Sequence, residues 1–133
     1  MIVLDASALV DYLTGSNPSA DAVRSIVREQ RPVAPEGVDL ECLSVFRGLV
    51  LGGKLDESDA QRAVELLSEM PIRRYPHTPL LGRIWELRHN AWPYDAAYVA
   101  LAETLDVPLL TIDSKLARIP GIRCAVINPA ERL

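Results

Sequence analysis

Short apolar runs alternate with segments of helical periodicity along this chain of 133 residues. The runs are too short for typical helices and are rich in Val, Ile and Leu, which is typical of buried strands. Strands separated by helices usually pair in parallel, because each helix carries the chain back to the starting end of the sheet. The pattern therefore predicts one α/β domain over residues 1–133, with helices on both faces of a parallel sheet. The predicted strands are residues 2–4, 72–75, 108–112 and 121–127.

Helical spacing defines the segments between these strands. Residues 38–51 are apolar on most of the helix circumference, which predicts a largely buried helix. Pro32 and Pro35 bracket a short connection or a brief strand. The other predicted helices are residues 7–13, 20–31, 56–70, 78–88 and 94–105.

Four acidic residues interrupt the most apolar stretches of the chain. Asp5 and Asp113 each follow a predicted strand, while Glu41 and Asp95 lie near the starts of two predicted helices. Carboxylates are rarely buried unless they are paired or bind a metal, and open parallel sheets bind ligands beyond the carboxyl ends of their strands. Taken singly, each acid also has a local explanation as a helix cap or an exposed side chain. Taken together, the four predict a pocket that binds a divalent cation.

Asp39 competes with Glu41 for a place in this pocket. The two residues are two positions apart on one predicted helix, so they do not share a helix face. Only one of them can enter a central pocket, and the sequence leaves both assignments open.

Charge and composition exclude several functions. The net charge of −4 argues against a basic surface that coats nucleic acid, although it is compatible with an enzyme that cuts nucleic acid. No apolar run approaches the ~18 residues that span a bilayer, and the N-terminus lacks the pattern of a signal peptide. Cys42 and Cys124 have no metal-ligand spacing. We therefore expect no membrane association and a reducing, cytoplasmic location.

Four motifs stand in a fixed order along the chain. They are Asp5-Ala6-Ser7-Ala8-Leu9-Val10, then Glu41 followed by Arg47, then Tyr94-Asp95-Ala96-Ala97-Tyr98-Val99-Ala100-Leu101-Ala102, and finally Thr111-Ile112-Asp113-Ser114-Lys115-Leu116-Ala117. Each motif is weakly specific alone. In this order and spacing, the chain resembles the PIN-domain ribonucleases, and most of all the VapC-type toxins of bacterial toxin–antitoxin pairs. The resemblance implies a three-layer α/β/α Rossmann-like sandwich with a central, mostly parallel sheet.

The same resemblance implies an endoribonuclease that hydrolyses RNA phosphodiester bonds with Mg²⁺ or Mn²⁺. Asp5, Glu41, Asp95 and Asp113 match the family's acidic residues and are the expected catalytic and metal-binding groups. Hard cations of this kind prefer carboxylate and water oxygens, which agrees with such a set.

Three further residues have roles implied by the resemblance. Ser7 and Thr111 match small hydroxyl residues that support the acids from outside the metal's own ligands. Arg47 matches a basic residue near the site, which either contacts RNA phosphate or pairs with an active-site carboxylate.

The resemblance also implies three partners, namely an RNA substrate, a small antitoxin protein and a second copy of the chain in a homodimer. The predicted helices 7–13, 20–31 and 56–70 are the candidate surfaces for protein contacts. The alternative function is a PIN-like module that binds RNA or protein without cutting, but the complete set of four acids argues against it. An aspartate-based phosphatase needs an acid at position 7, where this chain has Ser7.

Overall fold

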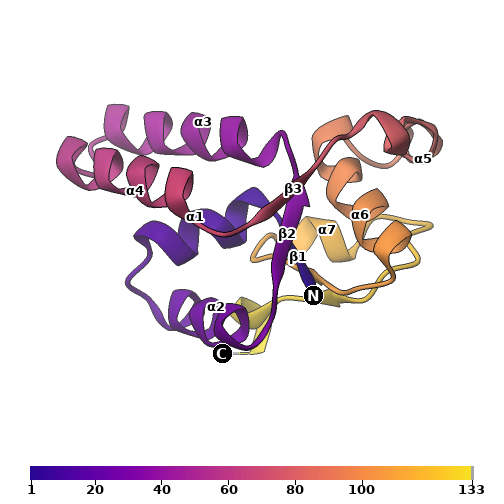
Figure 1. Ribbon diagram of the computed structural model, residues 1–133, viewed down its shortest axis with the longest axis horizontal. Helices are drawn as coiled ribbons and strands as arrows, with labels where there is room; N and C mark the ends of the chain where they lie inside the picture. Colours follow the sequence, from indigo (N-terminus) through magenta and orange to yellow (C-terminus); the bar gives the residue numbers. More distant parts are fainter. Residues whose placement is uncertain (133) are drawn as a thin grey trace.

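The sheet in the computed structural model, which describes residues 1–132, has five strands that all pair in parallel (Figure 1). The strands are β1 (Ile2–Leu4), β2 (Pro32–Pro35), β3 (Arg73–Tyr75), β4 (Leu109–Leu110) and β5 (Val126–Ile127). Their order across the sheet is β3-β2-β1-β4-β5. The predicted parallel sheet is thus confirmed.

Helices cover both faces of the sheet, which confirms the three-layer arrangement (Figure 1). One side carries α1 (Ala6–Thr14), α2 (Pro18–Glu29), α3 (Val38–Leu51) and α4 (Glu57–Glu69), and the other carries α5 (Leu81–Glu86), α6 (Pro93–Leu105) and α7 (Ser114–Ala117). Two 3₁₀ turns, η1 (Thr78–Leu80) and η2 (Pro129–Arg132), complete the elements of the described chain. None of the helices in residues 1–132 combines the length and the apolar character needed to cross a membrane.

The residues between Pro32 and Pro35 form a strand inside the sheet. Pro32 is the first residue of β2 and Pro35 is the last, so the missing N–H groups fall at the strand ends, where they disturb the ladder least. The N–H of Ile2 donates to the carbonyl of Arg31 at 3.0 Å, which continues the pairing past Pro32. A proline-flanked segment can therefore occupy a central position.

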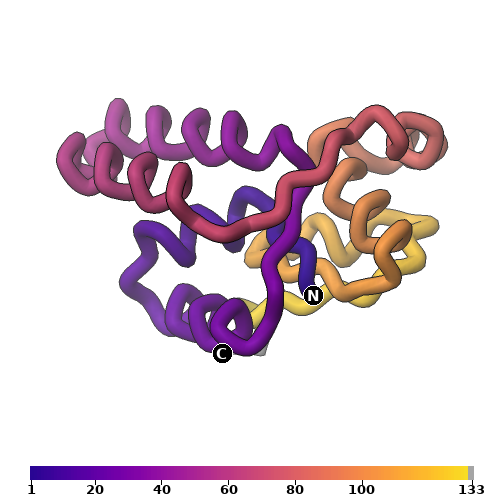
Figure 2. The backbone as a smooth tube through the Cα atoms, in the orientation of Figure 1, coloured from indigo at the N-terminus to yellow at the C-terminus, as the bar shows by residue number. Residues whose placement is uncertain are grey.

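Helix α3 is less buried than its apolar sequence predicts. Val38, Cys42 and Phe46, spaced four residues apart, are buried, whereas Leu40 and Leu51 are 73% and 70% exposed. The prediction of a largely buried helix was wrong. The reason is that α3 packs mainly on α1 and α4, and α3 and α4 together extend away from the sheet as an antiparallel pair (Figure 2).

The strand order creates a crevice between β1 and β4. The chain winds from β1 through β2 to β3 in one direction, while β4 and β5 lie on the other side of β1. In open α/β sheets, ligands bind beyond the carboxyl ends of the strands at the point where the winding reverses. Asp5 directly follows β1 and Thr111 directly follows β4, so both residues lie at this point.

Candidate active site

Asp5 is almost completely buried at the carboxyl end of β1, with 3% of its surface exposed. Its Oδ1 accepts hydrogen bonds from the N–H of Ala8, at 2.9 Å, and from the hydroxyl of Ser7, at 2.7 Å. Its Oδ2 accepts from the hydroxyl of Thr111 at 2.5 Å. Burial raises the pKa of Asp5 to about 6, even though these three hydrogen bonds lower it. Asp5 therefore caps the N-terminus of α1 and also lines the pocket. Its role as a helix cap does not exclude a role in binding a metal.

Ser7 and Thr111 join the segments that follow β1 and β4. The N–H of Ile112 donates to Ser7 Oγ at 3.2 Å, and the N–H of Asp113 donates to Thr111 Oγ1 at 2.9 Å. Each hydroxyl thus accepts from one backbone group and donates its proton to Asp5. The carboxylate of Asp5 is thus oriented by Ser7, two positions along the chain, and by Thr111, 106 positions away.

Glu41 reaches the same pocket from α3. Its Oε1 accepts a hydrogen bond from the hydroxyl of Tyr98 on α6 at 2.9 Å. Burial raises the pKa of Glu41, the Tyr98 hydrogen bond opposes the rise, and the charges of Asp95 and Asp5 add to it. Burial also raises the pKa of the Tyr98 hydroxyl, which keeps this group a donor at neutral pH.

Asp39 forms an ion pair with Arg74 of β3 and does not line the pocket. The Nε of Arg74 donates to Asp39 Oδ2 at 2.8 Å, and its Nη2 donates to Oδ1 at 2.9 Å. The same guanidinium also donates to the carbonyls of Ile72 and Leu67. Because Arg74 holds Asp39 in this two-bond arrangement, Glu41 is the α3 acid that reaches the pocket.

Asp95 and Asp113 complete the acidic lining of the pocket. Asp95 lies in the first turn of α6, where burial and the charge of Asp113 raise its pKa while Lys115 opposes the rise. Asp113 caps α7, a helix that the sequence pattern did not predict, by accepting from the N–H of Lys115 at 2.9 Å.

The four predicted acids thus line one pocket of about 450 Å³. No three Asp, Glu, His or Cys side chains of residues 1–132 lie close enough together to enclose a metal ion by themselves. An open pocket still suits Mg²⁺, which keeps several water ligands and takes only one or two carboxylates. Asp5 fits this role, because its three hydrogen bonds leave a lone pair on Oδ2 for a further ligand.

Arg47 does not lie beside the acids, contrary to the prediction. Helix α3 presents Glu41, Val45 and Leu49 to the pocket at the four-residue spacing of one helix face. Arg47 lies on a different face, is exposed, and forms no ion pair with an acid of residues 1–132. The structure supports neither a pairing of Arg47 with an active-site carboxylate nor a contact of Arg47 with a phosphate held in the pocket.

Two residues near the acids were not singled out from the sequence. Tyr98 reads as part of the apolar face of α6, and Lys115 reads as an ordinary exposed base. A signal existed for both, because Tyr98 follows Asp95 by three residues, which places the two on one helix face. Lys115 follows Asp113 by two residues, within the same short turn.

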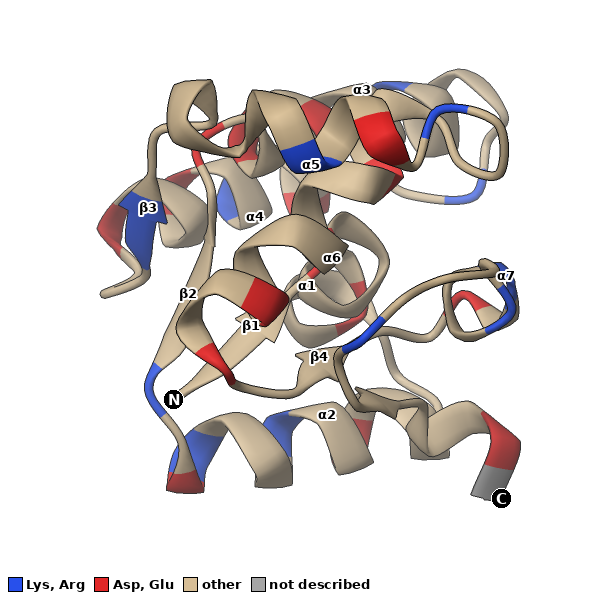
Figure 3. Cartoon of the chain, turned by 90° about the vertical axis from the view of Figure 1, so that its right-hand side faces the viewer, with Lys and Arg blue, Asp and Glu red and all other residues tan. Residues whose placement is uncertain are grey.

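Lys and Arg positions are spread along the ribbon in Figure 3 and are not concentrated in one element. Lys and Arg are scattered over α2, α4, α5, α7 and β3, with neutral and acidic segments between them. This scatter agrees with the net charge of −4. Binding of a polyanion at this face therefore depends on local groups and not on a broad positive field.

Comparison with known proteins places the chain in a family. The family model described as "PIN domain" matches residues 2–122. The chain belongs to the PIN-domain family. Among curated proteins, Ribonuclease VapC1 of Mycobacterium tuberculosis is 45% identical to this PIN-domain chain over 125 residues, which cover 93% of this chain and 94% of that relative.

Solved PIN-like structures share the fold at much lower sequence identity. FitAcB from Neisseria gonorrhoeae superposes with a TM-score of 0.73 at 16% identity, covering 97% of this chain and 98% of that one. VapBC2 from Rickettsia felis, solved bound to a DNA fragment from its promoter, gives a TM-score of 0.68 at 14% identity, covering 96% and 98%. These likenesses confirm the predicted α/β architecture.

Proposed function

We propose that this PIN-domain protein is an endoribonuclease that hydrolyses RNA with Mg²⁺ or Mn²⁺ and acts as the toxin of a toxin–antitoxin pair. The observation that carries the proposal is the set of four carboxylates, Asp5, Glu41, Asp95 and Asp113, around one pocket at the reversal point of the sheet. The 45% identity to Ribonuclease VapC1 supports RNA as the substrate.

The chain's own residues prepare the pocket for a cation and a phosphate. Asp5 would hold the metal directly, Asp95 and Asp113 would complete the site directly or through water, and Glu41 would be directed at the attacking water. When bound, a hard divalent cation supplies a water of lowered pKa and stabilises the charge that develops on the phosphoryl oxygens. The Ser7 and Thr111 hydroxyls keep the carboxylate of Asp5 in one orientation. The Tyr98 hydroxyl does the same for Glu41, whose raised pKa favours its taking up a proton from water.

Purified protein is expected to cut a circular RNA in the presence of Mg²⁺, which only internal cleavage can achieve. EDTA should abolish the cleavage. Asp95→Asn should lower kcat/KM by at least the ~10–100-fold that is typical when a group supporting a bound metal is lost. Gel analysis of the RNA with time provides the measurement.

Two outcomes would contradict the proposal. Cleavage that survives both EDTA and Asp95→Asn would have another source, such as a contaminating nuclease. A folded protein that cuts no RNA with either metal would favour the non-catalytic PIN-like module.

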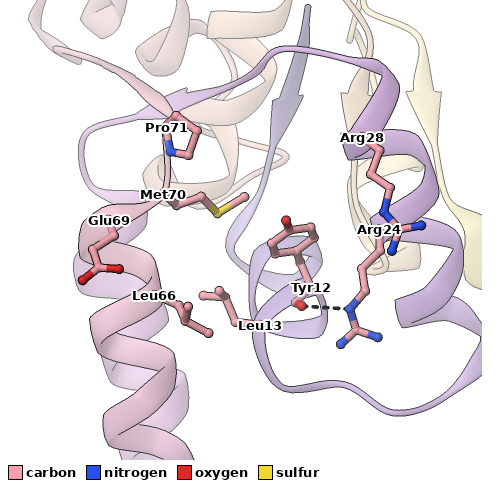
Figure 4. Close-up of a pocket in the computed structure, with 8 residues that line it drawn as sticks. All are labelled: Tyr12, Leu13, Arg24, Arg28, Leu66, Glu69, Met70 and Pro71. Atoms are coloured by element: carbon pink, nitrogen blue, oxygen red, sulfur yellow. Dashed lines mark hydrogen bonds between the residues drawn. The ribbon is translucent and has the colours of Figure 1, made fainter.

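The antitoxin is proposed to dock in a groove of about 440 Å³ between α1, α2 and α4 (Figure 4). Leu13 of α1 and Leu66 of α4 point toward one another across the groove, and the Met70 side chain lies above them. Arg24 is held by the carbonyls of Tyr12 and Gly15. Arg28 is exposed and lies at the same edge of the groove. The apolar part of the groove suits an apolar side chain of the antitoxin, and the two arginines at its edge suit a neighbouring acidic side chain.

Leu66→Glu is expected to weaken antitoxin binding by at least about tenfold, because the new carboxylate would replace the apolar contact between Leu66 and the antitoxin and would lie beside Glu69. RNA cleavage by the free toxin should not change, since the groove and the acidic pocket share no lining residue. Titration calorimetry with the cognate antitoxin measures the effect. Leu51→Glu, on an exposed position of α3 outside the groove, is the matched control. Equal weakening by both variants would argue against docking here.

A further inference from the structure

A second cavity, of about 220 Å³, adjoins the acidic pocket. It lies between the carboxyl end of β2 and the helices α5 and α6, and it is lined chiefly by Pro35, Leu81, Ile84, Pro93, Tyr94 and Ala97. Its volume is below the ~300–1,000 Å³ of clefts that take drug-sized ligands. The cavity therefore suits a group of one or two rings and not a whole nucleotide.

The two cavities share a wall. Glu41 and Tyr98 line both of them and are joined by a hydrogen bond of 2.9 Å. A group bound in the smaller cavity is therefore next to whatever the acids hold. If the acids hold the scissile phosphate, this group belongs to a flanking nucleotide.

The lining of the smaller cavity selects the chemistry of its ligand. No Lys or Arg contributes to the lining, so the cavity does not suit a phosphate. Its walls are mainly apolar, so it suits a ribose with several hydroxyl groups poorly. Tyr94 lines the cavity and is 68% exposed, so its ring is accessible to a ligand. Ala97, three residues further along α6, has a small side chain and leaves space on the same helix face. A flat ring with polar edges fits best, since Glu41 and His77 offer the few polar groups.

We propose that this cavity is a base subsite, in which an unpaired nucleobase next to the scissile phosphate stacks on Tyr94. The assignment rests on the proposed ribonuclease function and adds a substrate class to it. A base in a duplex is stacked on both faces and paired at its edge, so only a base that is unpaired or extruded can enter such a cavity. The preferred substrate is accordingly single-stranded RNA or a loop.

The test uses a single-stranded RNA oligonucleotide around a mapped cleavage site, and versions in which each nucleotide in turn is made abasic. One abasic position beside the scissile bond should lower kcat/KM of the wild-type protein about tenfold, the size of a typical base–aromatic stack. Tyr94→Ala should lower kcat/KM on the intact oligonucleotide by a similar factor. On the oligonucleotide that is abasic beside the scissile bond, Tyr94→Ala and wild type should have the same kcat/KM. Tyr94→Phe keeps the ring and should behave as wild type.

Two further variants separate loss of the subsite from general damage. Ala97→Leu fills the cavity without removing Tyr94 and should reproduce the loss seen with Tyr94→Ala. Trp85→Ala removes an aromatic residue of α5 that is 67% exposed and does not line the cavity, and it should cleave as wild type. Thermal unfolding followed by circular dichroism shows whether each variant is folded.

The outcomes distinguish this inference from the proposed function. A wild-type protein that cuts no RNA would refute the ribonuclease itself. If the wild-type protein cuts RNA and Tyr94→Ala cuts it equally well, the base subsite alone would be refuted. The base subsite would also be refuted if the effect of Tyr94→Ala on kcat/KM added to the effect of the abasic nucleotide at every position. Unchanged cleavage combined with loss of antitoxin inhibition would assign the cavity to the antitoxin instead.

Discussion

Asp5→Asn is expected to abolish metal-dependent RNA cleavage and, in the same molecule, to raise the free energy of unfolding at pH 7. Cleavage should be lost because the amide cannot replace a carboxylate as a ligand for a hard cation. Stability should rise because burial places the pKa of Asp5 near 6, against an ordinary value of 3.8. At neutral pH the charged form therefore costs about 3 kcal/mol, and the neutral amide avoids this cost while its oxygen still caps α1. Because the amide loses one acceptor, toward Thr111, we expect a net gain of about 2 kcal/mol.

The pH dependence of stability isolates this contribution. In the absence of divalent metal, the folded protein keeps a proton on Asp5 that the unfolded chain has lost, in the window between about pH 4 and pH 6. The contribution of Asp5 to stability is therefore constant below this window, falls as pH rises through it, and is constant again above it. The pKa values of Glu41 and Asp95 are also raised, so these residues add a trend of the same sign. Glu41 and Asp95 are present in both proteins, so their contributions cancel when the stability of Asp5→Asn is subtracted from that of wild type at each pH.

Urea unfolding in EDTA at several pH values measures this difference, and repeating the series with Mg²⁺ tests the metal. Mg²⁺ should stabilise the wild-type protein at pH 7 and have little effect on Asp5→Asn. An Asp5→Asn protein that is less stable than wild type at pH 7 would show that the three hydrogen bonds of Asp5 outweigh its desolvation. Equal stabilisation of both proteins by Mg²⁺ would show that Asp5 is not a ligand.

Glu41→Gln and Asp39→Asn are expected to have opposite effects, although the two residues are neighbours in sequence. Glu41→Gln should lower kcat/KM by about 100-fold or more, because an amide cannot act as a base. It should raise the free energy of unfolding at pH 7, because burial disfavours the charge of Glu41 and the amide oxygen can still accept from Tyr98. Asp39→Asn should leave kcat/KM unchanged and lower the free energy of unfolding by about 1–2 kcal/mol. The side chains of Arg74 and Asp39 are only 25% and 35% exposed, so Arg74 would keep its charge in a partly buried place without its partner.

The paired measurements are RNA cleavage rates and urea unfolding of each variant. Arg74→Gln is the matched control, since it breaks the same ion pair from the other side and should mimic Asp39→Asn in both assays. Loss of cleavage in Asp39→Asn with retained activity in Glu41→Gln would reverse the assignment of the two acids.

Much of the architecture followed from short-range patterns. The alternation of strands and helices was enough to predict a parallel sheet with helices on both faces, because each pattern is a property of a few consecutive residues. Residues 38–51 show the limit of such reasoning. Their apolar character predicts a helix, and they form one, but it does not reveal that Leu40 and Leu51 remain exposed. Burial depends on which other helices are available to pack, and a local pattern does not contain that information.

The position of Arg47 shows the same limit at the site. The family resemblance suggested a base near the acids, whereas the helix turns Arg47 away from the face that carries Glu41, Val45 and Leu49. Tyr98 was missed for the opposite reason. Its ring belongs to the apolar core, where it is 1% exposed, and only its hydroxyl takes part in the site.

The sequence by itself determined the order of most of the elements, although not α7 or the strand β2, and it determined the acids at the strand and helix ends and the family. Only the tertiary structure decided which acids share a pocket and how each is held. Asp5 is oriented by a hydroxyl 106 residues away, and Asp39 is removed from competition by an arginine 35 residues away. The physical reason is that secondary structure is set by neighbours along the chain, whereas the partner of a polar side chain is set by the strands and helices that packing brings beside it.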